Sequence, residues 1–383
     1  MKVCVSVHGR FHAFELARGL AARGCLGRLI TTYPAGVVRR VVGDGADVRT
    51  EPWLEARRRA GQWLGANGSR LDVAIQRRFG AAAARHLPAE GDVFVGWSAA
   101  SLEAIPAARE RGMRIVIERG STHIEHQTET LRDLYARHGL SFGDTAPETI
   151  ERELAEYETA DAIAVPSGFA ADTFVKRGVP AAKLIVNPYG VDLSAFAPGP
   201  DRAADAVPRI LFVGRVGFRK GVIELLAAFR ALAGAAELHL IGPVEDAIRP
   251  FLSEGPADGV FVRGALAADR LADAYRAADI FCLPSWEEGF PLVLLQAMAS
   301  GLPVVVTRAT GAADMITAGQ EGEIVQPGDI DGLTGALAAL VDDGERRERQ
   351  GAAARARVAG GWSWDDYVDR AVDHYRALME GAG

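Results

Sequence analysis

The stretch from 283 to 301, LPSWEEGFPLVLLQAMASG, places an acidic loop with a glycine directly before an apolar segment that is typical of a helix. The run 280–283 leads into this loop and is typical of a buried strand, so the stretch predicts a strand–loop–helix unit. Free backbone N–H groups at the start of a helix favour an anion. With Glu288 in the loop and Gln296 eight residues later, the stretch predicts a site for a phosphorylated, hydroxyl-rich ligand.

A second stretch, VGRVGFRKG from 213 to 221, adds two cations at the end of another predicted strand. Arg215 offers a planar fork to phosphate oxygens, and Lys220 adds a point charge. Glycines around these two cations let the backbone approach a ligand closely; they are Gly214, Gly217 and Gly221. The alternative is that both cations are solvated surface charges. Because the acidic loop that contains Glu288 follows downstream, we interpret the stretch as a diphosphate site.

Strand-like apolar runs alternate with amphipathic, helix-like segments along the chain, which predicts an α/β fold with parallel sheets covered on both faces. The first series of predicted strands is 2–7, 28–32, 92–95, 114–117, 161–165 and 183–186. The second series is 210–213, 237–241, 260–262, 280–283, 304–307 and 323–325. Helices are expected at 12–23, 99–111, 147–159, 169–177 and 362–379.

The two series are separated by 197–208, APGPDRAADAVP, which has no periodicity and is the predicted linker. We therefore expect an N-terminal domain at 1–200, a C-terminal domain at 208–361 and a terminal helix at 362–383. In such an arrangement ligands bind where the strands end, which places the active site in the cleft between the domains.

Several ordered motifs together resemble family 4 of the retaining glycosyltransferases. They are the turn after the first strand, ERGSTH at 118–123, VPSGFAADTFVKRGVPAAKLIVNPYGVD at 165–192, GRVGFRKG at 214–221 and EEGFPLVLLQAMASG at 287–301. The resemblance implies the GT-B fold, in which two Rossmann-like domains enclose a cleft and a C-terminal helix crosses back to the N-terminal domain. It also implies that the first domain binds the acceptor and that the second binds a nucleotide sugar.

In the resembled family, the residue that matches Glu288 contacts hydroxyls of the donor sugar, and those that match Arg215 and Lys220 neutralise the leaving diphosphate. Gln296 stands where the family usually has a second Glu that binds the ribose. Gln keeps one acceptor oxygen and gains two donors, so the expected loss is roughly 1 kcal/mol. The alternative is that Gln296 is a helix residue without a ligand.

The resemblance also assigns backbone contacts to the donor. The N–H groups of Gly289, Phe290 and Leu292 are expected to point at the phosphates, while Pro291 has no N–H to give. Arg263 falls where the family's nucleobase pocket lies, although an ordinary strand end is an equally good interpretation.

On the acceptor side, the turn His8–His12 follows the first predicted strand and lacks the full G-x-G-x-x-G of a dinucleotide site. Gly9 would allow close approach to the donor phosphates, and Arg10 would face acceptor or phosphate. Within ERGSTH, Arg119 is assigned to the acceptor side. His123 matches the family's histidine that lines the reaction centre, whereas a lone histidine can also be structural.

Segment 51–86 combines seven arginines with three acidic residues and interleaved tryptophans. It predicts either a helical pair with arginines in water, an acceptor-binding wall, or a peripheral contact with an anionic membrane surface. The N-terminal apolar run is too short for a signal peptide, and Cys4, Cys25 and Cys282 lack metal spacing. We therefore expect a cytoplasmic protein, with a peripheral position at the inner face of the cell membrane as the alternative.

The net charge and one further motif limit the classes of function that this sequence can have. The net charge of −7 argues against a nucleic-acid binder. Asp329 and Asp331 match a DxD pattern but follow Pro-Gly before a helix-like run, so we interpret them as helix-capping residues and expect no metal and no cofactor. We expect a retaining hexosyltransferase that uses a UDP-sugar, or next a GDP-sugar, and a hydroxyl of a glycan, lipid-linked or small-molecule acceptor. The alternatives are a non-catalytic nucleotide-sugar-binding subunit and a GT-B nucleotide-sugar epimerase.

Overall fold

The computed structural model describes residues 1–63, 69–143, 145–200, 206–253 and 259–381, and its strands form two parallel sheets. The first sheet has seven strands in the order β3-β2-β1-β4-β5-β6-β7. Their bounds are β1 Val3–Val7, β2 Leu26–Thr31, β3 Val48–Thr50, β4 Val93–Trp97, β5 Arg114–Glu118, β6 Ala162–Val165 and β7 Leu184–Val186. The strand order reverses beside β1, which places the carboxyl ends of β1 and β4 at a crevice.

The second sheet has six strands in the order β10-β9-β8-β11-β12-β13. Their bounds are β8 Arg209–Val213, β9 Glu237–Ile241, β10 Val260–Gly264, β11 Ile280–Leu283, β12 Val304–Thr307 and β13 Gly322–Val325. Here the order reverses between β8 and β11, so the two predicted ligand loops, which follow these strands, become spatial neighbours.

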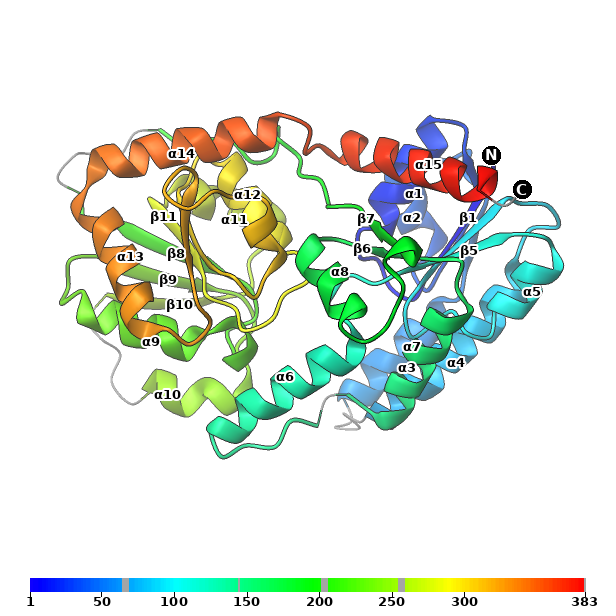
Figure 1. The fold of residues 1–383 in the computed structure, drawn as a ribbon, viewed down its shortest axis with the longest axis horizontal. Helices are drawn as coiled ribbons and strands as arrows, with labels where there is room; N and C mark the ends of the chain where they lie inside the picture. Colours follow the sequence, from blue (N-terminus) through cyan, green and yellow to red (C-terminus); the bar gives the residue numbers. More distant parts are fainter. Residues whose placement is uncertain (64–68, 144, 201–205, 254–258, 382–383) are drawn as a thin grey trace.

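Helices surround both sheets, and Figure 1 shows the two halves side by side. With the first sheet lie α1 Ala13–Ala22, α2 Ala35–Val42, α3 Pro52–Trp63, α4 Ser69–His86, α5 Ile105–Glu110, α6 Ile124–Arg137, α7 Pro147–Thr159 and α8 Gly168–Val175. The second half contains α9 Val222–Ala231, α10 Arg249–Ser253, α11 Ala268–Arg276, α12 Leu292–Ala299, α13 Ile330–Asp342 and α14 Gly344–Ala359. The last helix is α15 Trp364–Glu380.

Alternation along the first strand decides which helices cover which face. Val3, Val5 and Val7 pack with residues of α1 and α15, whereas Cys4 packs with residues of α4, α5 and α8. All four side chains are at most 1% exposed. The buried apolar area on both faces supplies the main driving force for this layered arrangement.

The final helix leaves the second half and returns to the first, as Figure 1 shows at the top of the molecule. A capping box at Ser363 starts α15. Its Val368 then packs so tightly on α1 that a Cβ on Gly19 would lie 2.4 Å from Val368 Cγ2. Arg23, the residue directly after α1, donates to Asp369 over 2.7 Å. The expected crossing of the C-terminal helix is therefore confirmed.

The α/β fold with two parallel sheets is also confirmed, including every predicted strand. Strand β3 was missed because its three residues, Val-Arg-Thr, form a short sheet edge without a buried run. The predicted helix at 99–111 is shorter, since the backbone turns at Ala99 with a φ of +69° before α5 begins. Residues 201–205 of the predicted linker lie outside the described residues, so the domain boundaries stay predictions. None of the helices in the described part of the chain is long and apolar enough to cross a membrane.

Candidate active site in the cleft between the two sheets

A cavity of about 660 Å³ lies between the two halves, at the carboxyl ends of their strands. The first half contributes residues that follow β1, β4 and β5, and the second contributes residues that follow β8 and β11. Predicted site residues that line the cavity are Arg119, Gly214, Arg215, Lys220, Glu288, Phe290, Pro291 and Leu292. The cavity thus has the position in which α/β proteins bind ligands.

The two predicted ligand loops meet in an ion pair between Lys220 Nζ and Glu288 Oε2. Gly221 makes this approach possible: its φ is +67°, and a Cβ there would lie 2.0 Å from the Pro284 carbonyl oxygen. Burial and the neighbouring Arg219 lower the pKa of Lys220 to about 7, while Glu287 acts in the opposite direction. The Glu288 carboxylate beside Lys220 also favours the charged form of the amine, and the two groups are positioned as an ion pair.

Two arginines add positive charge to the same wall of the cavity. Arg215 is exposed and makes no ion pair with any residue that the structure describes. Arg219 is half-buried and is already engaged, because its guanidinium lies 2.8 Å from Glu287 Oε2. Lys220 is likewise paired with Glu288, so among the described residues of this wall Arg215 is the cation that could meet a diphosphate without giving up a protein carboxylate. Arg219 was not among the predicted residues.

Glu287, the neighbour of the predicted Glu288, points the other way and joins the two halves. Its carboxylate is fully buried and accepts hydrogen bonds from Thr122 Oγ1 at 2.6 Å, Ser121 Oγ at 3.0 Å and Gln127 Nε2 at 3.2 Å. Burial raises the pKa of Glu287, but Arg219 and these donors outweigh it and lower the pKa to about 2. The group is thus a buried carboxylate with partners in both halves.

Backbone packing beside Glu287 adds to the same contact between the two halves. A Cβ on Gly289 would lie 2.5 Å from Ser121 Cα, and the Gly289 carbonyl accepts from Ser167 Oγ over 2.7 Å. Asp314 accepts from the Gly168 N–H at 2.6 Å, at the start of α8. Gly289 therefore faces the first half and does not line the cavity, unlike its neighbours Phe290 to Leu292.

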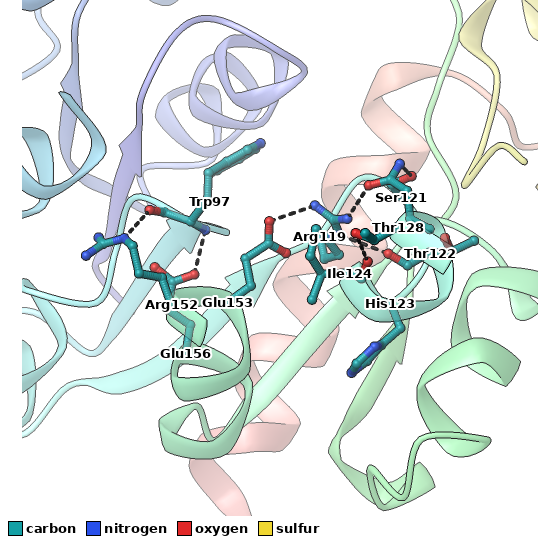
Figure 2. A network of polar contacts seen from close by, with 12 residues as sticks. Trp97, Arg119, Ser121, Thr122, His123, Ile124, Thr128, Arg152, Glu153 and Glu156 are labelled. Atoms are coloured by element: carbon teal, nitrogen blue, oxygen red, sulfur yellow. Dashed lines mark hydrogen bonds and ion pairs between the residues drawn. The ribbon is translucent and has the colours of Figure 1, made fainter. Parts of the chain in front are cut away.

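Arg119 lines the cavity but is held by its own domain, as Figure 2 shows. It donates to Glu153 Oε1 at 3.0 Å, to Gln127 Oε1 at 2.8 Å and to the Thr122 carbonyl at 3.0 Å. Gln127 in turn bonds Glu287, so Arg119 supports the contact between the halves. Its side chain is nearly fully buried, and no acceptor contact is needed to explain it.

His123 does not reach the cavity. It is the N-cap of α6, where its Nδ1 accepts from the Glu125 N–H at 3.3 Å, and its ring packs against Tyr157 and Phe174. Figure 2 shows its side chain directed away from Arg119. Burial, with Arg119, lowers the pKa of His123 to about 4, so the ring is neutral. The structure gives His123 a helix-capping role, and its expected place at the reaction centre stays a prediction.

Two further predicted donor residues, Gln296 and Arg263, have partners outside the cavity lining. Gln296 Oε1 accepts from Tyr275 Oη at 3.1 Å within the second half. Arg263 lies on the exposed strand β10, with its guanidinium 5.2 Å from the centre of the Phe261 ring. Among the residues that the structure describes, neither Gln296 nor Arg263 lines the cavity.

The turn after β1 lines the main cavity with other residues than those predicted. Gly9 donates its N–H to Thr32 Oγ1 at 3.1 Å and lines a smaller side cavity together with Arg10. Instead His12, which sequence reasoning missed, reaches the main cavity and pairs with Glu118 Oε2 at 3.3 Å. Its position four residues after His8 in a strand-end turn was the available signal.

The loop after β4 forms the opposite wall and is fixed by the buried carboxyl group of Glu156. Glu156 accepts from the N–H groups of Ala99 at 2.6 Å, Ser101 at 2.7 Å and Leu102 at 2.9 Å. Figure 2 shows it beside Arg152, which donates to the Ala99 carbonyl at 3.1 Å. Burial raises the pKa of Glu156 to about 8, against the backbone donors that favour the charged form. The wall is therefore rigidly placed.

The DxD-like pair lies far from these residues in the sequence and has a local role. Asp329 is the N-cap of α13 and accepts from the Gly332 N–H at 2.8 Å, as the interpretation of helix capping predicts. Asp331 lies in the first turn of the same helix, where a negative charge is favourable.

Comparison with known proteins identifies the class. Residues 10–195 match the family profile described as Glycosyltransferase Family 4, and residues 207–343 match the one described as Glycosyl transferases group 1. The two matches follow one another and cover both halves of the cleft. The chain therefore belongs to the family 4 and group 1 glycosyltransferases, and the expected family membership is confirmed.

Individual relatives and a solved structure agree with this class. The chain is 35% identical over 214 residues to the sulfoquinovosyl transferase of Arabidopsis thaliana, an alignment that spans 52% of this chain and 41% of the relative. It is 28% identical over 316 residues to a GDP-mannose-dependent alpha-(1-6)-phosphatidylinositol monomannoside mannosyltransferase of Mycobacterium tuberculosis, spanning 76% of this chain and 78% of that one. The structure resembles that of Anabaena HepE in complex with UDP and glucose, with a TM-score of 0.69 and 16% identity over 98% of this chain and 100% of that one. This last likeness concerns the fold alone, which is that of the GT-B glycosyltransferases.

Proposed function

We propose that this protein is a retaining glycosyltransferase that transfers a hexose from a nucleoside-diphosphate sugar to an acceptor hydroxyl. The observation that carries the proposal is the Lys220–Glu288 ion pair in a cavity that also presents Arg215. A cation for a diphosphate and a carboxylate for sugar hydroxyls are thus adjacent at the strand ends. Neither group needs a metal to act on such a ligand.

In this proposal Arg215 and Lys220 stabilise the charge that develops on the departing diphosphate. Preorganised charges of this kind are commonly the largest single contribution to catalysis. Glu288 accepts hydrogen bonds from hydroxyls of the donor sugar and fixes the orientation of the ring. The binding of the phosphates would separate Lys220 from Glu288 and leave each with a ligand partner. Phe290, Pro291 and Leu292 form the adjoining wall.

The proposed step forms a bond between the acceptor oxygen and the anomeric carbon and breaks the bond from that carbon to the diphosphate. The acceptor proton passes to the departing phosphate oxygen on the same face of the sugar. The nucleoside diphosphate then leaves with that proton, and the configuration of the anomeric carbon is retained.

We further propose that residues 1–200 bind the acceptor, that 208–361 bind the donor and that 362–383 hold the helix that returns to the first part. The expected preference for a UDP-sugar over a GDP-sugar now has competing support. The mycobacterial relative is named for GDP-mannose, and the Anabaena structure contains UDP. Both bases therefore belong in the test.

A second candidate function is a non-catalytic nucleotide-sugar-binding subunit, which Gln296 favours, because its Oε1 is already bonded to Tyr275. An epimerase is a third. The test is nucleoside diphosphate release from UDP- and GDP-hexoses with and without acceptor, followed by NMR of the first product. Transfer with an unchanged anomeric configuration supports the proposal. Binding without turnover supports the subunit, and an epimerised nucleotide sugar supports the epimerase.

We also propose that α3 and α4 make a peripheral contact with an anionic membrane surface. Trp53 is 50% exposed, and Arg57, Arg77 and Arg85 are exposed without an ion pair among the described residues. Amphipathic basic helices with a tryptophan bind such surfaces. Flotation with neutral and with anionic liposomes tests this: binding that does not depend on anionic lipid contradicts it.

A further inference from the structure

A smaller cavity of about 460 Å³ opens beside the main cavity within the first half of the molecule. It lies between the turn after β1 and the helices α3 and α4. The two cavities share three residues, His8, Phe11 and Gln76, so they are connected along this wall. A ligand in the side cavity would therefore reach the interdomain cavity directly.

Two buried polar atoms at this junction have no hydrogen-bond partner within the described part of the chain. They are His8 Nε2 and Gln76 Oε1, from the turn after β1 and from α4. Buried polar atoms are nearly always hydrogen-bonded, so two such exceptions on one wall point to a ligand. Burial also lowers the pKa of His8, whose ring packs on Phe79 and is neutral at neutral pH.

An aromatic ring is presented at the same junction. Phe11 is 68% exposed, although it lines both cavities, and its φ of +41° is a conformation that bulky residues rarely adopt. Gly9 lies against the ring, since a Cβ there would be 3.3 Å from Phe11 Cε2. Backbone strain of this kind concentrates at functional sites. The ring offers an apolar face to a ligand that also carries polar groups.

The charges around the side cavity balance one another. Its wall includes Glu55 and Asp72 as well as Arg10 and Arg58. Arg58 is committed to Glu55, with hydrogen bonds of 2.9 Å and 2.7 Å to its two oxygens. An anionic ligand would have to compete with Glu55 for Arg58 and would also face Asp72. A neutral ligand avoids both costs.

We propose that this side cavity is the acceptor subsite and that it takes the neutral pyranose ring of a glycoside. The C–H face of the ring packs on Phe11, one ring hydroxyl donates to Gln76 Oε1, and another bonds His8 Nε2. A free hydroxyl of the same ring then points into the interdomain cavity. The inference rests on the proposed transferase function and deepens it, because it selects a neutral sugar over a phosphorylated acceptor.

The experiment measures nucleoside diphosphate release from UDP-glucose and GDP-mannose with three kinds of probe. These are the methyl glycosides of glucose, galactose and mannose, glycerol as a polyol without a ring, and myo-inositol 3-phosphate as an anionic acceptor. We expect at least one methyl hexoside to raise release well above hydrolysis, while glycerol and the inositol phosphate do not.

Variants then locate the subsite. Gln76→Leu and Phe11→Ala are each expected to raise the acceptor KM about tenfold, with the donor KM within about twofold of wild type. Gln76→Glu keeps the accepting oxygen and should lie closer to wild type than Gln76→Leu. Gln320→Leu changes an exposed glutamine that lines neither cavity and is the matched control.

The outcomes separate the inference from the function on which it rests. Faster transfer to the inositol phosphate than to any hexoside overturns the neutral-sugar inference, as do hexoside KM values that neither Gln76→Leu nor Phe11→Ala changes. Hydrolysis of a donor with no acceleration by any hexoside also overturns it and leaves the transferase proposal in place. If the wild type neither binds nor hydrolyses any donor, the proposed function itself fails.

Discussion

Thr122 Oγ1 in the first half of the molecule donates a hydrogen bond of 2.6 Å to Glu287 Oε1 in the second. This bond belongs to a network that also includes Ser121, Gln127 and Arg219, and it lies next to the proposed donor contact at Glu288. The loop that carries the proposed donor site therefore also holds the two domains in their relative placement. Contacts between the domains and the proposed contacts with the ligand are made by adjacent residues.

Glu287 should contribute to stability in a manner that depends on pH. Because its pKa is lowered from 4.5 to about 2 in the folded protein, the contribution is fully present above pH 4.5 and is lost as the pH falls toward 2. We expect Glu287→Ala to lower the free energy of unfolding at pH 7 by about 3 kcal/mol, since it leaves Arg219 and three donors without their partner. Thermal or urea unfolding between pH 7 and 3 measures this.

The control for that experiment is Glu345→Gln, which changes a carboxylate whose side chain is 91% exposed. Its unfolding curve should match the wild type, because exposed ion pairs contribute little. A Glu287→Ala protein as stable as this control at pH 7 would show that the interdomain network does not stabilise the fold.

Gly289→Ala should push the two domains apart. The added Cβ would lie 2.5 Å from Ser121 Cα and 2.7 Å from the Gly120 carbonyl oxygen, and backbone atoms cannot move aside cheaply. We expect kcat/KM to fall by about tenfold or more, because small displacements of positioning groups are costly in catalysis. Steady-state kinetics and small-angle scattering measure the two consequences.

Gly335→Ala is the matched control for this substitution, since a Cβ there meets no atom within 4 Å and Gly335 lies in α13. It should leave kcat/KM unchanged and stabilise the helix by up to about 1 kcal/mol. Equal activity of the two variants would contradict the close packing at Gly289.

His123 should prove to be structural. Its Nδ1 caps α6, and its lowered pKa of about 4 keeps the ring neutral over the working pH range. We expect His123→Asn, which keeps a capping oxygen, to retain kcat within about threefold, and His123→Leu to lose about 1 kcal/mol of stability through the lost cap. Kinetics and thermal unfolding of both variants test this. A loss of kcat of two orders of magnitude in His123→Asn, in a folded protein, would restore the residue to the reaction centre.

The linked effect of pH on His123 has a defined sign. Since its pKa is lowered from 6.5 to about 4 in the folded protein, the unfolded chain binds the proton more readily, and folding loses stability as the pH falls from 6.5 to 4. His123→Asn should remove this part of the acid sensitivity. An unchanged slope of stability against pH in the variant would show that the ring is not buried in its neutral form.

Much of the fold could be predicted because the strands are buried on both faces and appear as continuous apolar runs. The ligand loops after β8 and β11 could also be predicted, since strand ends, glycines and charges lie together in the sequence. The sequence could not reveal which way adjacent residues point: Glu287 and Glu288 share one loop, yet one faces the other domain and the other faces the cavity.

The direction of a side chain, which the sequence does not reveal, also explains the different positions of two histidines. His12 and His123 both follow strands of the first sheet, and only the packing around them decides that His12 reaches the cavity and that His123 caps a helix. Gln296 lies at the spacing of a ribose ligand but is bonded to Tyr275. Spacing predicts the neighbourhood of such a residue, whereas its partner depends on contacts that form only in three dimensions.

The central claim is that Lys220 and Glu288 form the nucleotide-sugar site. The most direct measurement is a thermal-shift titration of the wild type and of Lys220→Met with UDP, GDP and their hexose conjugates, with Arg349→Met as an exposed control. A ligand that binds only the folded protein raises its stability by mass action. We predict a clear shift with one diphosphate series in the wild type and the control, and its loss in Lys220→Met. No shift with any nucleotide, or an equal shift in Lys220→Met, would contradict the account.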